Sequence, residues 1–293
     1  MIVRTRRPAW ATSVQATGWG RSTDAELAWG KSRRAALRWA LAGALLGALV
    51  GLLVFAPAAW LARALASATE QRLLLADARG SVWSGSALAV LTGGPQSRDA
   101  SALPGRLHWT LSPTLRGLEL QLRQACCLNG TVALQLQPSL GGVTAQLVGQ
   151  PDWIGQWPSA WLSGLGTPFN TLRLGGMLRL ASPGLTLRSV QGRLQIDGQA
   201  ELSLLGASSR LAPLDTLGSY RLGLRADPAN SGHSLLTLAT VEGALQLSGK
   251  GSWGPEGVRF RGEARAASDE TVLSNLLNII GRRDGARSVI SIG

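Results

Sequence analysis

The chain has 293 residues and a formal net charge of +12, and nearly all of its 29 basic residues are arginines. Eight basic residues but only two of the 17 acids precede residue 39, so the remainder carries a net charge of +6. No basic stripe with interleaved aromatic residues and no nucleic-acid-binding signature occurs, which excludes a nucleic-acid partner from our expectations. The length allows one large domain or two small ones, with a real core.

An uncharged apolar segment near the N-terminus predicts a transmembrane helix over residues 38–62. Residues 39–62 contain no charge, and Trp39 and Trp60 stand at the two ends, where indole rings favour the membrane interface. As a helix these residues would span about 36 Å, enough for a hydrocarbon core of about 30 Å. Residues 1–37 form a basic tail without periodicity, which we expect to be disordered.

The basic tail also predicts orientation. The arginine excess before the span places the N-terminus in the cytoplasm and everything after about residue 63 on the other side. Two alternatives remain. Residues 66–68 (Ala-Ser-Ala) have the form of a signal-peptidase site, although the apolar run is long for a signal core of about 7–15 residues. Residues 32–37 resemble a twin-arginine export signal, with Ala36 in place of the usual bulky residue.

Three glycines inside the span are spaced for helix packing. Gly43, Gly47 and Gly51 lie four residues apart and therefore on one helix face. Such small residues let a second helix approach closely, so we expect a helix-packing face here. The alternative is that glycine and alanine are merely abundant in this segment.

Beyond the span, apolar residues alternate with polar ones, which is the period of half-buried strands. The alternating sets include Leu107, Trp109 and Leu111, then Leu118, Leu120 and Leu122, then Val132, Leu134 and Leu136, and later Leu185 and Leu187, Leu222 and Leu224, Leu236 and Leu238. Turn residues interrupt these runs every 8–12 positions: Asn129-Gly130, Gly141-Gly142, Gly175-Gly176, Pro183-Gly184, Asp197-Gly198, Glu242-Gly243 and Pro255-Glu256-Gly257.

This pattern predicts a mainly β protein, with an antiparallel β domain over residues 63–267. The inward residues are mostly leucine, and few aromatic residues are available to fill a thick core. We therefore favour an extended, curved antiparallel sheet over a compact sandwich. Residues 268–293 predict a short C-terminal helix, with acids in its first turn and Arg282-Arg283 after its end, followed by a strand.

Two local clusters depart from this rhythm. Trp153, Trp157 and Trp161 lie four apart, and Pro158 disfavours a helix at Trp157, so we expect two short turns here. The tryptophans are candidates for a partner interface or a membrane-surface contact, or they plug the end of the sheet. Cys126 and Cys127 are adjacent, so either they form a vicinal disulfide or one points into the core and the other outward.

The sequence offers no catalytic constellation. The two histidines, His108 and His233, stand far apart without an acidic cluster, so we expect no metal site. No nucleophile elbow, phosphate loop or dinucleotide fingerprint occurs in a proper strand–turn–helix context. We therefore expect neither an enzyme nor a cofactor.

Several stretches, in order, resemble the N protein family of the bacterial type II secretion system. These are residues 55–60 (FAPAAW), 79–85 (RGSVWSG), 104–105 with 109–111, 217–222 (LGSYRL), and 276–278 with 281–285 (GRRDG). The resemblance covers about residues 38–293. It implies an accessory, non-catalytic protein of the bacterial inner membrane, single-pass, with a periplasmic β domain. The long N-terminal tail and the Cys126-Cys127 pair depart from the family pattern.

The resemblance implies that other inner-membrane secretion components are the partners, bound through the span and the sheet. An alternative function belongs to another class. An extended β-groove lined by leucine could carry lipid across the periplasm, and an open apolar inner face would favour it. Periodicity alone leaves both functions open.

Overall fold

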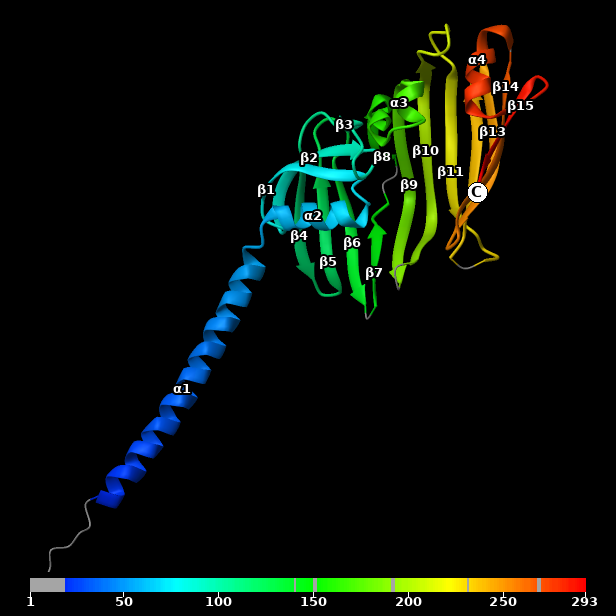
Figure 1. Cartoon of the computed structure of the whole chain (residues 1–293). Helices are drawn as coiled ribbons and strands as arrows, with labels where there is room; N and C mark the ends of the chain where they lie inside the picture. Colours follow the sequence, from blue (N-terminus) through cyan, green and yellow to red (C-terminus); the bar gives the residue numbers. More distant parts are fainter. Residues whose placement is uncertain (1–18, 140, 150–151, 191–192, 231, 268–269) are drawn as a thin grey trace, which may run out of the picture. The chain divides into compact units, whose positions relative to one another are not determined.

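The computed structural model describes residues 19–139, 141–149, 152–190, 193–230, 232–267 and 270–293. The chain divides into two compact units, one ending at Phe55 and the other spanning Ala56–Gly293. Figure 1 shows the elements of both units along the chain.

The described residues of the first unit form one long helix, α1 (Trp19–Val54). Its segment Ala36–Val54 has a mean hydropathy of 2.0 and is long and apolar enough to cross a membrane. The helix differs from our expectation at both ends. It begins within the tail predicted to be disordered, of which residues 1–18 lie outside the described residues, and it ends eight residues before position 62.

The early end of α1 has a local cause. Pro57 has no N–H to continue a helix, and it adopts an extended conformation (φ −69°, ψ 146°) as the N-cap of a second helix, α2 (Ala58–Ala68). The apolar stretch predicted as one span is thus divided between two helices. Residues 58–62 belong to the second unit, where Ala58 is only 1% exposed.

The second unit is built on one antiparallel sheet. Its first strands are β1 (Leu73–Gly80), β2 (Ser84–Thr92), β3 (Ala100–Ala102), β4 (Leu107–Thr114), β5 (Gly117–Arg123), β6 (Thr131–Ser139), β7 (Gly142–Leu147) and β8 (Trp153–Pro158). A 3-10 helix, η1 (Ser159–Leu165), and the short α3 (Phe169–Leu172) follow. The later elements are β9 (Leu174–Val190), β10 (Arg193–Ser209), β11 (Gly218–Ala226), β12 (Ser234–Glu242), β13 (Leu245–Gly254), β14 (Gly257–Ala266), α4 (Glu270–Ile280), β15 (Arg282–Asp284) and β16 (Arg287–Ile292).

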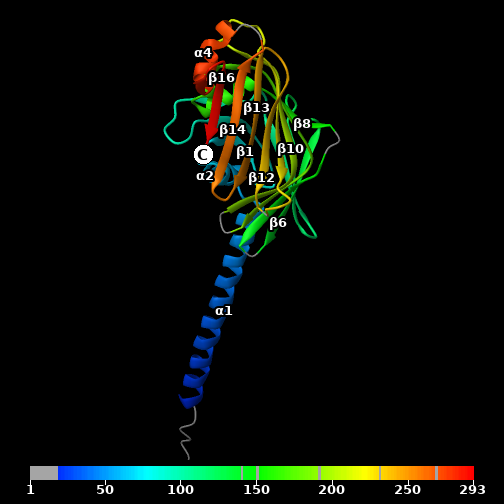
Figure 2. The same cartoon turned by 90° about the vertical axis from the view of Figure 1, so that its right-hand side faces the viewer.

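The strands follow one another in space almost as they do in sequence. The order is β1-β2-β4-β5-β6-β7-β9-β10-β11-β12-β13-β14-β16-β15, with β3 paired to β2 and β8 paired to β9. Figures 1 and 2 show that the sheet is curved. The predicted fold class is therefore confirmed: one apolar N-terminal helix, an extended curved antiparallel sheet and a short C-terminal helix.

Three of the predicted turns lie instead within long strands. Gly175-Gly176, Pro183-Gly184 and Asp197-Gly198 fall inside β9 and β10, each of which has 17 residues. The ladder between β9 and β10 shifts register between Gln199 and Glu201 and between Leu205 and Ser208. Glycines at positive φ accommodate these irregularities, with Gly176 at 109° and Gly198 at 101°. They are β-bulges, which bend a strand without ending it.

The α2 helix covers one face of the sheet at its first end. Ala58 packs with Ala87 and Trp109 in a buried cluster, called here the α2 core, with Leu61, Leu75, Ala78, Leu120 and Leu122 around it. The indole of Trp109 is 3% exposed, and its Nε1 donates a hydrogen bond to the carbonyl oxygen of Val82 (3.1 Å). Gly85 lies opposite Trp109 in the ladder and leaves space for the ring.

The α4 helix covers the same face at the other end of the sheet, as Figures 1 and 2 both show. Its Leu273, Leu276 and Leu277 are fully buried in a larger cluster, the α4 core, which also contains Ala207, Ala212, Leu217, Tyr220, Leu245 and Ala264. The Tyr220 hydroxyl donates to the carbonyl oxygen of Leu245 (3.0 Å), and burial raises the pKa of this tyrosine. The hydroxyl of Ser288 in β16 donates to the carbonyl oxygen of Leu277 (2.7 Å) and ties α4 to the sheet.

Candidate interaction surfaces

The glycine face of α1 consists of Gly43, Gly47 and Gly51. A Cβ atom added to any of these glycines would meet no atom of the described chain within 4 Å. The surrounding leucines are exposed as well, for example Leu46 at 63%. The face is therefore open to a second helix, and its use for helix packing stays a prediction.

The middle of the α2/α4 face of the sheet is apolar, and no helix of the described residues lies over it. Cross-strand partners share a face, and the ladder runs Leu120–Leu134, Leu134–Leu147 and Leu147–Leu185 across β5, β6, β7 and β9. We define the leucine face as Leu134, Leu136, Leu147, Leu185, Leu187, Leu222, Leu224 and Leu236. None belongs to a buried cluster; seven are half-buried and Leu222 is 36% exposed.

The opposite face of the same strands is polar. Around the leucine face, the residues that alternate with its leucines include Gln135, Gln146, Arg188, Arg221 and Arg225, all of them exposed. Ion pairs cross this polar face, such as Arg221 Nε with Glu201 Oε1 at 2.9 Å. The sheet thus separates a polar surface from an apolar one, as the alternation predicted.

The first edge strand, β1, is protected by charge and by a bulge. Its register shifts between Ala76 and Arg79, and Asp77 adopts a positive φ of 48° within the irregularity. The Asp77 carboxylate lies 2.7 Å from Arg106 Nη1 and 2.8 Å from Arg79 Nη2. Hydrogen bonds from Arg106 and Arg79 hold the pKa of Asp77 below its usual value. Bulges and charges are devices that prevent an edge strand from pairing with another chain.

The last edge of the sheet is less protected. β15 has only three residues and pairs with Arg287–Val289 of β16, so among the described residues no strand pairs with this side of residues 290–292. Ile292 at this edge is 54% exposed. Arg287 forms ion pairs with Asp284 and Glu263, but these charges lie only at the start of β16.

The three candidate tryptophans lie close in the sequence but on different elements. Trp153 and Trp157 stand on β8 and Trp161 stands on η1, so a strand and a 3-10 helix replace the two turns that we predicted. Pro158 is the junction between them. The rings of Trp157 and Trp161 stack at 6.5 Å and pack on Ala89, Leu103 and Cys127. All three tryptophans are half-buried, and their role as a partner interface stays a prediction.

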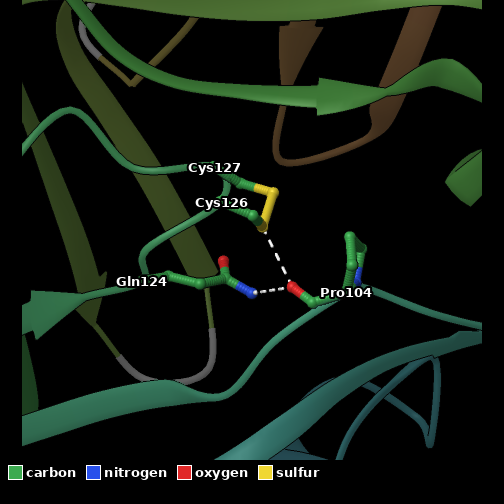
Figure 3. Close-up of a disulfide and its surroundings, with 4 residues drawn as sticks. All are labelled: Pro104, Gln124, Cys126 and Cys127. Carbon is green, nitrogen blue, oxygen red and sulfur yellow. Dashed lines mark hydrogen bonds between the residues drawn. A yellow bond between two sulfur atoms is a disulfide. The ribbon is translucent and has the colours of Figure 1, made fainter.

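Cys126 and Cys127 form a vicinal disulfide in the loop between β5 and β6. Cys127 is 3% exposed, whereas Cys126 is exposed, so both of our alternatives hold together: the pair is oxidised, and one residue points inward and the other outward. Figure 3 shows the disulfide beside Pro104 and Gln124, whose Nε2 donates to the Pro104 carbonyl oxygen (3.3 Å).

Sequence reasoning missed three features. The Asp77–Arg106 pair joins residues 29 positions apart, and no local pattern indicates such a contact. The packing of α2 on the sheet was hidden because its apolar residues continue those of the span. The leucine face is partly exposed because α2 and α4 cover only the two ends of the sheet. The alternation of apolar and polar residues in the sequence does not indicate where helices pack.

The family comparison agrees with these observations. A family model described as type II secretion system protein N matches residues 71–290, three quarters of the chain. The match begins just before β1 and ends within β16, so it covers the sheet except for the last two residues of β16. Neither a comparison with curated proteins nor one with solved structures gives a match. The resemblance found in the sequence is confirmed: the chain belongs to the family of type II secretion system protein N. This family supplies a component of a protein-secretion machine and is not a known family of enzymes.

Proposed function

We propose that this protein is an accessory inner-membrane component of the type II secretion system that works by binding other single-span components. In this proposal α1 crosses the inner membrane with its N-terminus in the cytoplasm, as the arginine excess before the span favours. The β domain then lies in the periplasm. The family match supports a role in protein secretion, and the single apolar helix fits a single-pass protein.

The observation that carries the contact mechanism is the open edge of β16. Unpaired backbone N–H and C=O groups at a sheet edge are a template for a strand from another chain. Residues 290–292 offer such groups beside the exposed side chain of Ile292. The β1 edge, by contrast, carries a bulge and an ion-paired aspartate, so we expect partners at the β16 end.

The glycine face supplies the second contact. Helices in a membrane associate through close packing of small residues, because lipid leaves no hydrophobic force to bring them together. Gly43, Gly47 and Gly51 have no neighbour within the described chain, and a partner helix would bring their backbones within packing distance.

In-cell crosslinking tests the proposal. A photoreactive residue at Ser291 should capture another inner-membrane secretion component, identified by mass spectrometry. Ile292→Lys should reduce this adduct at least about 5-fold, because a charge at an edge strand opposes pairing. Val241→Lys is the matched control, since Val241 is equally exposed (56%) but lies away from the edge. Adducts that ignore Ile292→Lys would remove the edge from the mechanism, and the absence of any secretion component would overturn the proposal.

A second candidate function, binding of lipid acyl chains, is favoured by the leucine face. A sheet face with eight partly exposed leucines is unusual for water-soluble surfaces, where large apolar patches mark binding sites. In the sequence, the β domain begins at Ala56, directly after a helix long and apolar enough to cross a membrane. A domain attached to a membrane would meet lipid as its most abundant apolar ligand.

The same crosslinking method separates the two functions. A photoreactive residue at Leu222 or Leu134 should give phospholipid adducts if acyl chains bind the leucine face. Leu235 is the control, because it is similarly exposed (38%) and its neighbour Leu236 points to the opposite side of the sheet. Lipid adducts at Leu222 and Leu134 but not at Leu235 would support lipid binding, and equal labelling at all three positions would reject it.

A further inference from the structure

We propose that the Cys126–Cys127 disulfide is a reducible clamp that holds β8 and its tryptophans to the sheet, with the sulfur of Cys126 as the point at which a dithiol attacks. This inference is independent of the proposed function. It rests on what the disulfide loop touches, on the unequal burial of its two cysteines and on the few attachments of β8.

The loop between β5 and β6 is the second attachment of β8. Among the described strands, β8 pairs only with β9. On its other side, Gln156 N donates to the carbonyl oxygen of Cys127 (2.8 Å), and Asn129 N donates to the carbonyl oxygen of Ile154 (3.0 Å). Asn129 Nδ2 also donates to the carbonyl oxygen of Trp153 (2.9 Å). The segment that carries the disulfide therefore hydrogen-bonds β8 along its length.

The side chain of Cys127 adds a packing contact to these hydrogen bonds. It is buried against Leu103, Ala89, Trp157 and Trp161. The backbone carbonyl of Cys127 also lies against Gly155, where a Cβ would come within 3.1 Å of it and within 2.4 Å of the Trp157 ring. The backbone around Cys127 thus has to be held in one conformation for β8 to dock.

A disulfide between neighbours acts on that local conformation. The stabilisation that a crosslink gives by restricting the unfolded chain grows with the length of the loop it closes, and adjacent residues close the shortest loop. The bond instead fixes the dihedral angles of Cys126 and Cys127 relative to each other. Reduction frees them, and the expected loss is local order at β8 rather than unfolding of the sheet.

Unequal burial decides the direction of the exchange. Thiol–disulfide exchange requires a thiolate to reach one sulfur, and that sulfur here is Cys126 Sγ. Attack forms a mixed disulfide between the reductant and Cys126, while Cys127 leaves as a thiolate and takes up a proton. The second thiolate of the dithiol then attacks the reductant's first sulfur, which is bonded to Cys126 Sγ, and Cys126 leaves as a thiolate that takes up a proton. The dithiol loses two electrons and becomes a disulfide, and the cysteine pair gains them.

A backbone carbonyl oxygen lies where it can accept a hydrogen bond from the Cys126 thiol of the reduced protein. Cys126 Sγ lies 3.0 Å from the carbonyl oxygen of Pro104 (Figure 3). A sulfur in a disulfide has no proton to donate, so in the oxidised protein this approach is a contact. After reduction, the Cys126 thiol can donate to the same oxygen, which favours retention of the dithiol state.

Hydrogen–deuterium exchange of the full-length protein in detergent tests the clamp. We compare the oxidised protein with protein treated with dithiothreitol, which needs no substitution. Reduction should raise amide exchange in 152–158 and 127–130 by at least about 10-fold, as expected for loss of local protection. Exchange in β10 and β11 is the internal control and should not change. Unchanged exchange in β8 after complete reduction, verified by mass, would overturn the proposal.

Two variants test the point of attack. Cys127→Ser leaves the Cys126 thiol, and Cys126→Ser leaves the Cys127 thiol. Cys126 should form a mixed disulfide with an aromatic disulfide reagent at least about 10-fold faster than Cys127, because access limits exchange. Equal rates under native conditions would reject Cys126 as the point of attack. Circular dichroism verifies that both variants retain the sheet.

Discussion

The two ends of the sheet are built alike on their faces and differently at their edges. At each end a helix covers the same side of the sheet, α2 at the β1 end and α4 at the β16 end. The α2 core has three buried residues, with the indole of Trp109 at its centre, whereas the α4 core buries three leucines of the helix itself. The α4 end therefore has the larger core, although its edge is the more open one.

At the α4 end, the residues that stabilise the sheet differ from the strand edge that is available to a partner. Apolar burial by α4 stabilises the end of the sheet without using the strand edge, so the side of residues 290–292 that faces away from β14 has no partner strand among the described residues. The β1 edge shows the opposite solution, in which a bulge and an aspartate paired with two arginines close the edge beside a smaller core. Under the proposed function, the end that binds a partner needs a stable core and an available edge, and of the two described ends the α4 end has both.

Removal of a core leucine at each end should give the largest effect and tests the difference between the cores. Leu276→Ala leaves a cavity at a position that is 1% exposed, and we expect a loss of about 2–5 kcal/mol in the free energy of unfolding. Leu61→Ala in α2 affects a half-buried side chain and should cost about 1 kcal/mol. Denaturant unfolding followed by circular dichroism measures both. Equal losses would show that the two cores contribute equally and would contradict the comparison.

A glycine substitution examines the α2 end more closely. A Cβ at position 85 would lie 2.5 Å from Trp109 Cζ2 and 2.6 Å from the carbonyl oxygen of Arg79. Because both a packed ring and the backbone of β1 obstruct it, Gly85→Ala should lower the free energy of unfolding by about 1–3 kcal/mol.

Gly184→Ala is the matched control for this substitution. It also lies in a strand, but no atom stands within 4 Å of its added Cβ, and its effect should stay within about 0.5 kcal/mol. If both variants unfold at the same denaturant concentration, close packing between Gly85 and Trp109 does not hold the α2 end.

The sequence predicted what depends on periodicity and left out what depends on curvature and distance. Leu118, Leu120 and Leu122 alternate in sequence and share a face in β5, because side chains in a strand alternate regardless of its neighbours. Asp197-Gly198 resembles a turn in the sequence because glycine readily adopts the positive φ that turns need. Only the pairing with β9 shows that the strand continues there and that its register shifts just afterwards, between Gln199 and Glu201. Nothing near Pro57 in the sequence indicates that residues 58–62 pack on a sheet rather than continue the membrane span.

The candidate surfaces also divide into those that local spacing predicts and those that depend on contacts between distant residues. The glycine face follows from spacing alone, and the tryptophans were found but placed in the wrong elements. The clamp required two facts that no local pattern contains: that Cys127 lies beside β8, and that Cys126 does not share its burial. Contacts between residues far apart in the chain are a property of the ladder order, which hydrophobic alternation leaves undetermined.

The smallest expected effect concerns the protected β1 edge and its pH dependence. The pKa of Asp77 is lower in the folded protein than the value of about 3.9 for a free aspartate, chiefly through the hydrogen bond from Arg106. A depressed pKa means that the stabilisation by Asp77 is complete above the unfolded pKa and is lost as the pH falls through the folded pKa. The side chain is solvent-exposed, so the effect should be modest and should weaken with salt.

Comparison with Asp77→Asn isolates this contribution from that of Asp227, whose pKa is also lowered, chiefly by the side chain of Asn230. We expect wild type to be the more stable protein at pH 6 and low salt, and the difference between the two proteins to vanish as the pH falls through the folded pKa of Asp77 and the carboxylate is protonated. Thermal unfolding followed by circular dichroism across this range measures the difference. A constant difference at every pH would mean that the bulge, rather than the charge on Asp77, closes the β1 edge, and the contrast between the two edges would then rest on backbone geometry.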